Sequence, residues 1–233
     1  MPMPFRNVTL FRPLLAGAKP LDRLLAGIGA IIGISLTMVI CAQLPLTASD
    51  LPFVVAPIGA SAVLVFAVPT SPLAQPWSVV GGNILSALVG VTVARYVPNI
   101  FLAAGLAVGG AILLMSLLRC LHPPGGASAL TAVIGSAVVH DAGYAFAFAP
   151  VGINSIALVS LGMFFHRMSG RSYPHVPPLA AQDRAVVNRV AGFHPEDIDR
   201  ALDDMDESFD ISRADLELLL AQAEIHAKAR QAY

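Results

Sequence analysis

Most of this chain is poor in charged residues. Only 12% of its 233 residues are Asp, Glu, Lys or Arg, about half the share that a soluble domain carries. Between residues 24 and 165 there is no Lys and no Glu, and the charged side chains are Asp50, Arg95, Arg119 and Asp141. So long a segment with so few charges cannot present a soluble surface. We therefore expect lipid to cover it.

Other absences narrow the function. No Gly-x-x-x-x-Gly-Lys-Ser/Thr loop occurs, which argues against direct coupling to ATP. No His/Cys/Asp/Glu cluster has metal-ligand spacing, and no nucleophile–base constellation is recognisable. We therefore expect a protein that is not an enzyme and that has no metal site and no cofactor. Cys41 and Cys120 lie in or beside apolar runs, where packing is their expected role.

Apolar residues, in contrast, are abundant and form runs separated by prolines. Six runs have about the length that crosses the hydrocarbon core of a bilayer: 24–42, 51–68, 77–97, 100–118, 123–139 and 144–165. They predict an all-α, polytopic transmembrane helical bundle. Six crossings are our preferred interpretation because 51–68 is long enough to span. Four spans with 51–68 and 123–139 re-entrant remain the alternative.

Basic residues predict the orientation. They flank the start of the first run and the end of the last: Arg6, Arg12, Lys19, Arg23, Arg167 and Arg171. Positive charge stays on the cytoplasmic side, so we expect a multi-pass protein of the cell inner membrane with both termini in the cytoplasm. The expected divisions are a cytoplasmic N-terminal segment (1–23), a transmembrane domain (24–170) and a cytoplasmic tail (171–233).

The tail differs from the rest in charge. Residues 182–233 hold six Lys/Arg against twelve Asp/Glu, whereas residues 1–181 hold eight against three. Two amphipathic helices are expected in it, one starting at Pro195 and one capped by Ser212. The second should bury Leu216, Leu219 and Leu220. So small a region lacks a large core, which suggests a cytoplasmic protein partner. The lipid bilayer, a small anion and a second copy of the chain are the other expected partners, and nucleic acid is not.

Two motifs indicate an internal repeat. Residues 57–62 read Pro-Ile-Gly-Ala-Ser-Ala and residues 124–129 read Pro-Gly-Gly-Ala-Ser-Ala, at an offset of 67. Gly82 with Ala87-Leu-Val matches Gly152 with Ala157-Leu-Val at an offset of 70. Two halves of three segments each would have opposite orientations, which is the inverted-repeat pattern of many secondary transporters. The alternative is coincidence, since Gly, Ala and Ser are common in membrane helices.

The segment from His122 to Ser128 is the main candidate site. Its prolines and glycines predict a loop that gives way to a helix beginning near Ala127, whose free N–H groups and dipole favour an anion. A proline kink with small residues for close packing is the structural alternative. Residues of this motif, of its repeat and of the third and sixth segments form the predicted substrate-binding set: His122, Pro123, Pro124, Gly125, Gly126, Ser128, Gly59, Ser61, Asn83 and Asn154.

At His122-Pro-Pro the sequence resembles the HPP family of integral membrane proteins. The resemblance covers roughly residues 20–175 and includes four further stretches: 56–63, 71–76, 81–90 and 171–174. It implies a membrane domain usually described with four spans, and it implies nitrite transport loosely, through plant and cyanobacterial relatives. The tail is similar to the linker that joins such domains to paired CBS modules, and no such module occurs in these 233 residues.

We therefore expect a membrane transport protein for a small solute, with a small inorganic anion such as nitrite as the leading candidate. A cation carrier usually needs membrane-embedded acids, and the apolar runs contain none. The alternative is a membrane sensor or scaffold that recruits a partner through its C-terminal tail and carries no flux.

Overall fold

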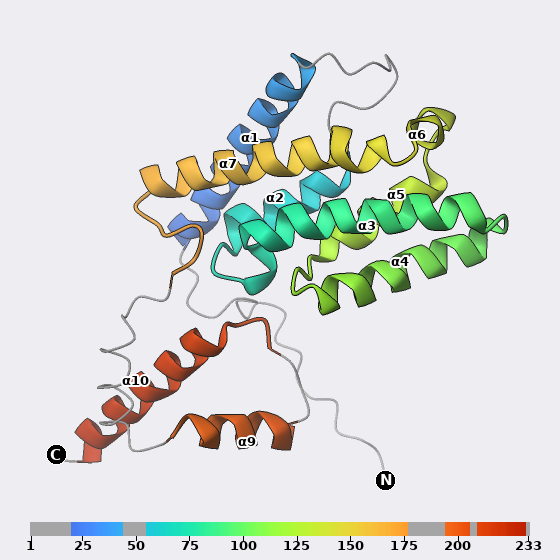
Figure 1. The fold of residues 1–233 in the computed structure, drawn as a ribbon. Helices are drawn as coiled ribbons and strands as arrows, with labels where there is room; N and C mark the ends of the chain where they lie inside the picture. Colours follow the sequence, from blue (N-terminus) through green and yellow to red (C-terminus); the bar gives the residue numbers. More distant parts are fainter. Residues whose placement is uncertain (1–19, 44–54, 177–193, 206–208, 232–233) are drawn as a thin grey trace, which may run out of the picture.

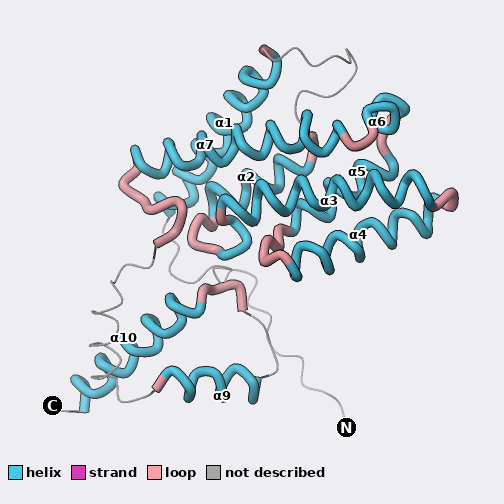
Figure 2. The backbone as a smooth tube through the Cα atoms, viewed as in Figure 1, coloured by secondary structure: helices cyan, strands magenta, loops and turns pink. Residues whose placement is uncertain are grey.

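The computed structural model describes residues 20–43, 55–176, 194–205 and 209–231 (Figure 1). The basic residues before position 20 and the beginning of the run 51–68 lie outside the described residues. Helices and loops account for everything that is described, which confirms the all-α prediction (Figure 2).

The described elements follow the predicted runs closely. In chain order they are α1 (Pro20–Ala42), α2 (Pro57–Ala67), the 3₁₀ turn η1 (Pro72–Ala74), α3 (Pro76–Tyr96), α4 (Ile100–Leu117), α5 (Pro123–Ile134), α6 (Ala137–Ala142), the π-helical turn η2 (Ala147–Gly152), α7 (Ile153–Met168), α9 (Pro195–Met205) and α10 (Arg213–Gln231).

Four stretches are long and apolar enough to cross a membrane: α1, α3, α4 and the continuous stretch from Ala147 to Met168. The other two predicted segments appear as shorter helices. α2 has 11 residues and α5 has 12, which corresponds to about 17 and 18 Å, well short of a hydrocarbon core of about 30 Å. The described part of the chain therefore contains four long apolar helices and two shorter helices, α2 and α5, that do not reach across the hydrocarbon core by themselves.

Large apolar side chains cover the outside of the long helices. Ile31 of α1 is 69% exposed, and Phe101 and Leu113 of α4 are 86% and 67% exposed. Exposure of these side chains to water would cost free energy, whereas the acyl chains of a bilayer solvate them. The exposed faces of α1 and α4 thus support the expected contact with lipid.

α3 lies at the centre of the bundle, where it packs against α4, α5, η2 and α7 (Figure 1). Close approach depends on glycine. A Cβ added to Gly82 would lie 2.6 Å from the Cβ of His122, and one added to Gly90 would lie 2.3 Å from the carbonyl oxygen of Ala129. These two glycines bring the backbones of α3 and α5 together, as small residues do in membrane bundles.

The loop 68–75 between α2 and α3 lies at the same end of the bundle as the beginning of α1 and the end of α7. The hydroxyl of Tyr173, just after α7, donates to the carbonyl oxygen of Ala74 at 2.9 Å. Arg171 forms an ion pair with Asp22 at the start of α1. We call this end of the molecule the loop end.

The tail helices begin as predicted. α9 starts at Pro195, and Ser212 caps α10 by accepting a hydrogen bond from the backbone N–H of Asp215 at 3.1 Å. Of the three leucines predicted to be buried, Leu216 is half-buried, and the prediction was wrong for the other two: Leu219 is 60% exposed and Leu220 is 39% exposed. The spacing of apolar residues predicts which side chains share one face of a helix, but no described element covers the face of α10 that carries Leu219 and Leu220.

Candidate functional site

His122 begins the site, in an extended conformation just before α5. Its φ of −142° and ψ of 107° suit a residue that precedes proline, and Pro123 and Pro124 occupy the first two positions of α5. The helix therefore starts at Pro123, four residues before the predicted start near Ala127. Proline is accepted there because its fixed φ matches the helix and the first N–H groups have no helical partner anyway.

Both ring nitrogens of His122 have partners. Nδ1 lies 2.8 Å from the carbonyl oxygen of Leu73, in the loop 68–75, and Nε2 lies 2.8 Å from Oγ of Ser61 on α2. A carbonyl oxygen only accepts, so Nδ1 carries the hydrogen. In the neutral ring Ser61 then donates to Nε2. The Ser61 hydroxyl has the carbonyl oxygen of Pro57 at 3.2 Å as a second acceptor.

Asn83 on α3 joins three serines from three other helices. Its Nδ2 lies 3.2 Å from Oγ of Ser61 and 3.2 Å from Oγ of Ser155, while its Oδ1 accepts from Oγ of Ser128 at 2.8 Å. Each of these side chains, like His122, is fully buried. The five residues thus form one connected group, which we call the polar network: Ser61, Asn83, His122, Ser128 and Ser155.

The polar network is neutral. Its members are three hydroxyls, one amide and one imidazole, and no carboxylate, Lys or Arg side chain bonds to it among the described residues. Burying such groups is costly unless their hydrogen bonds are made. Here they are made, and they tie α2, α3, α5 and α7 together at one point.

A further hydroxyl lies beside the polar network without a partner. Ser86, one turn after Asn83 on α3, is fully buried, and its Oγ has no hydrogen-bond partner among the described residues. A Cβ added to Gly125 would lie 2.7 Å from this oxygen. An unsatisfied buried donor of this kind requires an explanation, such as a bound group.

The prolines and glycines of the predicted site have structural contacts. The N–H of Gly125 donates to the carbonyl oxygen of His122 at 2.8 Å, and Pro123 and Pro124 have no N–H to offer. At the start of α2, the N–H groups of Ile58 and Gly59 donate to Val55 and Ala56. Some of the N–H groups at the starts of α2 and α5 therefore already donate to carbonyl oxygens of their own chain. The donors that face the interior are the side chains of the polar network.

Some predicted residues lie apart from the polar network. Asn154 accepts from the backbone N–H of Val55 at 2.9 Å and donates to Sγ of Cys41 at 3.1 Å, so it ties α7 to α1 and to the start of α2. Gly59 is exposed, and no atom lies within 4 Å of where its Cβ would be. Pro123 is exposed and Gly126 is half-buried.

Sequence reasoning missed Ser155. The residue directly follows Asn154, and consecutive helix positions differ by about 100° in direction. Asn154 was predicted as the polar amide of the sixth apolar segment, but the packing of α7 turns Ser155 toward Asn83 instead. The signal that could have identified Ser155 was its position directly after Asn154 in the sequence.

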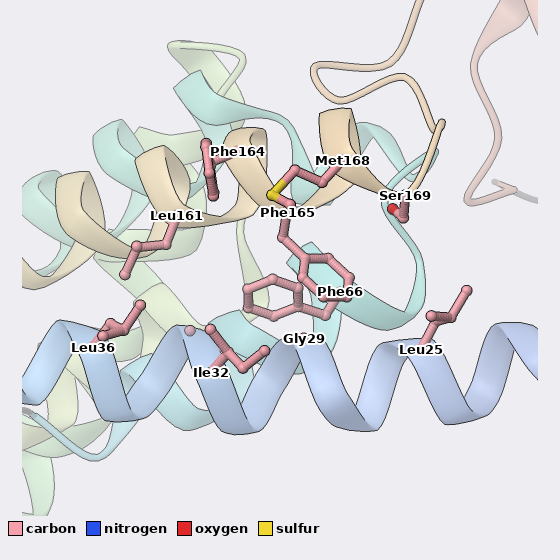
Figure 3. Close-up of a pocket in the computed structure, with 11 residues that line it drawn as sticks. Leu25, Gly29, Ile32, Leu36, Phe66, Leu161, Phe164, Phe165, Met168 and Ser169 are labelled. Carbon is pink, nitrogen blue, oxygen red and sulfur yellow. The ribbon is translucent and has the colours of Figure 1, made fainter.

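One cavity lies away from these groups. It has a volume of about 380 Å³ and is partly open between α1 and α7, with an apolar lining that includes Leu25, Phe66 and Phe164 (Figure 3). A smaller cavity of about 120 Å³ lies beside Arg95 and His140, toward the end opposite the loop end. The first cavity is lined almost entirely by apolar side chains and contacts no member of the polar network. Among the described residues, no three His, Cys, Asp or Glu side chains are grouped so as to hold a metal ion.

Comparison with known proteins places this arrangement in a family. Residues 16–174, which contain α1 to α7, match the family described as HPP, transmembrane region. The chain belongs to the HPP family. This confirms the resemblance drawn from His122-Pro-Pro and establishes a multi-pass integral membrane protein.

Relatives add little about the solute. Two proteins of Dictyostelium discoideum, each named only as a transmembrane protein, are 39% identical to the HPP chain over 120 and 127 residues. These matches cover 49% and 52% of the chain, and 42% and 40% of the relatives. The chain thus spans about two fifths of the length of these relatives. No solved structure matches it.

Proposed function

We propose that this HPP protein transports a small solute across the membrane, and that the solute is a small inorganic anion such as nitrite. The observation that carries the proposal is the polar network, in which buried, uncharged donors from four helices meet at one point. Ser61, Asn83 and Ser128 can turn their O–H and N–H groups toward an anion. The absence of a carboxylate from the network favours an anion over a cation.

Ser86 supports the same proposal. Its buried hydroxyl has no hydrogen-bond partner among the described residues and lies one turn from Asn83. In this proposal a bound solute completes its hydrogen bonds. An anion of three or four atoms needs only small donors close together, and the serines and the amide of Asn83 offer them.

Six crossings form part of the proposal. α2 ends at the loop 68–75, which is also where α5 begins, because Leu73 contacts His122. α2 and α5 therefore run in opposite directions, and in this proposal each belongs to one crossing. Two inverted halves, each with a short broken segment, correspond to the repeat pattern of secondary transporters. In this topology the protein lies in the cell inner membrane and its loop end faces the cytoplasm.

The direct test is uptake of nitrite, nitrate and other small anions into proteoliposomes that contain the full chain. We expect nitrite flux well above that of empty vesicles, and a large loss of flux in the variant Asn83→Ala. Equal flux in protein-containing and empty vesicles for every anion would refute anion transport.

A second candidate function is a sensor or scaffold that recruits a protein through its tail. The exposed leucines of α10, Leu219 and Leu220, favour it. Deletion of residues 182–233 separates the two functions. Flux that survives the deletion supports the carrier, whereas a cellular phenotype that is lost with the tail, in a chain without flux, supports the scaffold.

A further inference from the structure

The tail contacts the membrane domain at the loop 68–75 and just after α7. Oγ of Ser71 donates to a carboxylate oxygen of Asp210 at 2.7 Å. Nε2 of His175 lies 3.0 and 2.9 Å from the two carboxylate oxygens of Asp215, in the first turn of α10. Two acidic residues, one just before α10 and one in its first turn, therefore bind two polar residues at the loop end.

These contacts are sheltered from solvent. Ser71 is 4% exposed and the side chains of His175 and Asp215 are 14% and 20% exposed, whereas Asp210 is exposed, so the contact of His175 with Asp215 is the better sheltered of the two. A hydrogen bond to a carboxylate at such a position is screened less than one on an open surface. Asp215 also lies in the first turn of α10, where the helix dipole favours a negative charge.

The loop 68–75 is internally braced, so a force on one part of it reaches the rest. Nε2 of Gln75 donates to the carbonyl oxygens of Pro69 at 3.0 Å and Ser71 at 2.8 Å. Oε1 of the same side chain accepts from the backbone N–H of His175 at 2.9 Å. The segment that carries the tail contact is thus tied to the loop by its backbone as well.

The same loop closes one end of the polar network. The carbonyl oxygen of Leu73 holds Nδ1 of His122, and Leu73 lies between Ser71 and Gln75 in the sequence. For the loop to move away from His122, the contacts of Ser71 with Asp210 and of the His175 segment with Gln75 and Asp215 must loosen. Access to the polar network from the loop end is therefore mechanically linked to the position of α10.

We propose that the acidic start of α10 is a latch that holds the loop 68–75 closed over the polar network, so that the tail restrains solute access from the loop end. The proposal rests on the proposed transport function for its consequence, but the latch itself is a physical contact that can be measured separately. Release of α10, by a bound partner or by loss of the two contacts, loosens the loop, which Tyr173 and the backbone of His175 still contact.

Two variants in the full chain break the latch at different points: His175→Ala removes the imidazole that binds Asp215, and Asp210→Ala removes the acceptor of Ser71. Matched controls are His226→Ala on α10 and Asp203→Ala on α9, both exposed. Loop amides that exchange slowly in the closed state are available for the measurement, since Ser71, Ala74 and Gln75 donate to backbone carbonyls within the loop.

Hydrogen exchange of peptides that cover the loop 68–75, followed by mass spectrometry, gives the first measurement. We expect exchange about tenfold faster in both latch variants and unchanged in both controls, as loss of one charge-assisted hydrogen bond would produce. Unchanged exchange in both latch variants would overturn the latch, whatever happens to transport.

Nitrite flux into proteoliposomes gives the second measurement. Faster flux in His175→Ala and Asp210→Ala than in the parent chain supports the restraint. Faster exchange with a parent flux that is measurable but unchanged in the variants would overturn the restraint on access. A parent chain with no flux of any anion counts against the transport function, and in that case the exchange result alone decides whether the latch exists.

Discussion

Ser61 and Ser128 hydrogen-bond to opposite ends of one side-chain amide, that of Asn83. The two serines occupy equivalent positions in the repeated Pro-x-Gly-Ala-Ser motif, and each also approaches the carbonyl oxygen of the proline four residues earlier, at 3.2 and 3.5 Å. The motif and its copy thus converge on a single residue of α3. Each of the two similar motifs thus contributes one serine to the polar network.

Asn83→Ala should abolish transport and lower stability, because it leaves the hydroxyls of Ser61, Ser128 and Ser155 without their shared partner. We expect nitrite flux to fall by more than about tenfold, as for loss of more than about 1.4 kcal/mol of binding or transition-state free energy. Asn154→Ala is the matched control, since Asn154 lies outside the polar network. It should lower the unfolding temperature while most of the flux remains, and equal losses of flux in the two variants would contradict a role specific to the network.

Ser86→Ala should separate function from stability. Removal of a buried hydroxyl that has no partner costs little or even stabilises the fold, so the unfolding temperature should stay within about 2 °C of the parent value. Flux should nevertheless fall if the hydroxyl binds solute. Thr37→Val is the control, because Thr37 on α1 is also buried and without a partner among the described residues. Unchanged flux in Ser86→Ala would remove Ser86 from the solute path.

Gly82→Ala should destabilise the bundle at the contact between α3 and α5. The added Cβ would lie 2.6 Å from the Cβ of His122 and 2.8 Å from the carbonyl oxygen of Cys120, and overpacking of this kind costs about 1–3 kcal/mol. Gly109→Ala on α4 meets no atom within 4 Å and should be neutral or slightly stabilising. Thermal unfolding in detergent compares the two, and similar unfolding temperatures would contradict the tight contact.

The six-crossing topology predicts that the loop 68–75 and the connection between α3 and α4 lie on opposite sides of the membrane. Thr70→Cys and Pro98→Cys place thiols at exposed positions of these two loops. Native Cys41 and Cys120 are buried, and burial raises the pKa of the Cys120 thiol, which keeps it unreactive. In intact cells a thiol reagent that cannot cross the inner membrane should label position 98 and spare position 70. Labelling at position 70 would favour four spans.

The burial of the Tyr173 hydroxyl predicts that the protein loses stability at high pH. Burial raises the pKa of its hydroxyl above the usual value of about 10. Because the folded pKa is the higher one, the stability linked to this group is fully present below pH 10 and is lost as the pH rises from there through the folded pKa. Tyr173→Phe lacks the bond to Ala74 and should lose less of its stability above pH 10. Tyr96→Phe, at a position 76% exposed, controls for the remaining tyrosines.

Much of this fold was predictable from hydropathy, because lipid-covered helices must be apolar over their whole length. The bounds of α3 and α4 differ from the predicted runs by one residue. The start of α5 was harder to predict, since Pro123 and Pro124 are compatible with a loop as well as with the first turn of a helix. His122, Ser61 and Asn83 were all in the predicted substrate-binding set, and in the structure Ser61 hydrogen-bonds to both of the others. Ser86 and Ser155 were not found, because which side of a fully apolar helix faces the interior depends on packing.

The neutrality of the polar network has an electrical consequence. An anion held among uncharged groups carries its whole charge through the membrane field, and moving one elementary charge against a potential of 100 mV costs about 2.3 kcal/mol. Electrogenic uptake into a cell that is negative inside would then be opposed by the voltage, and export would be assisted.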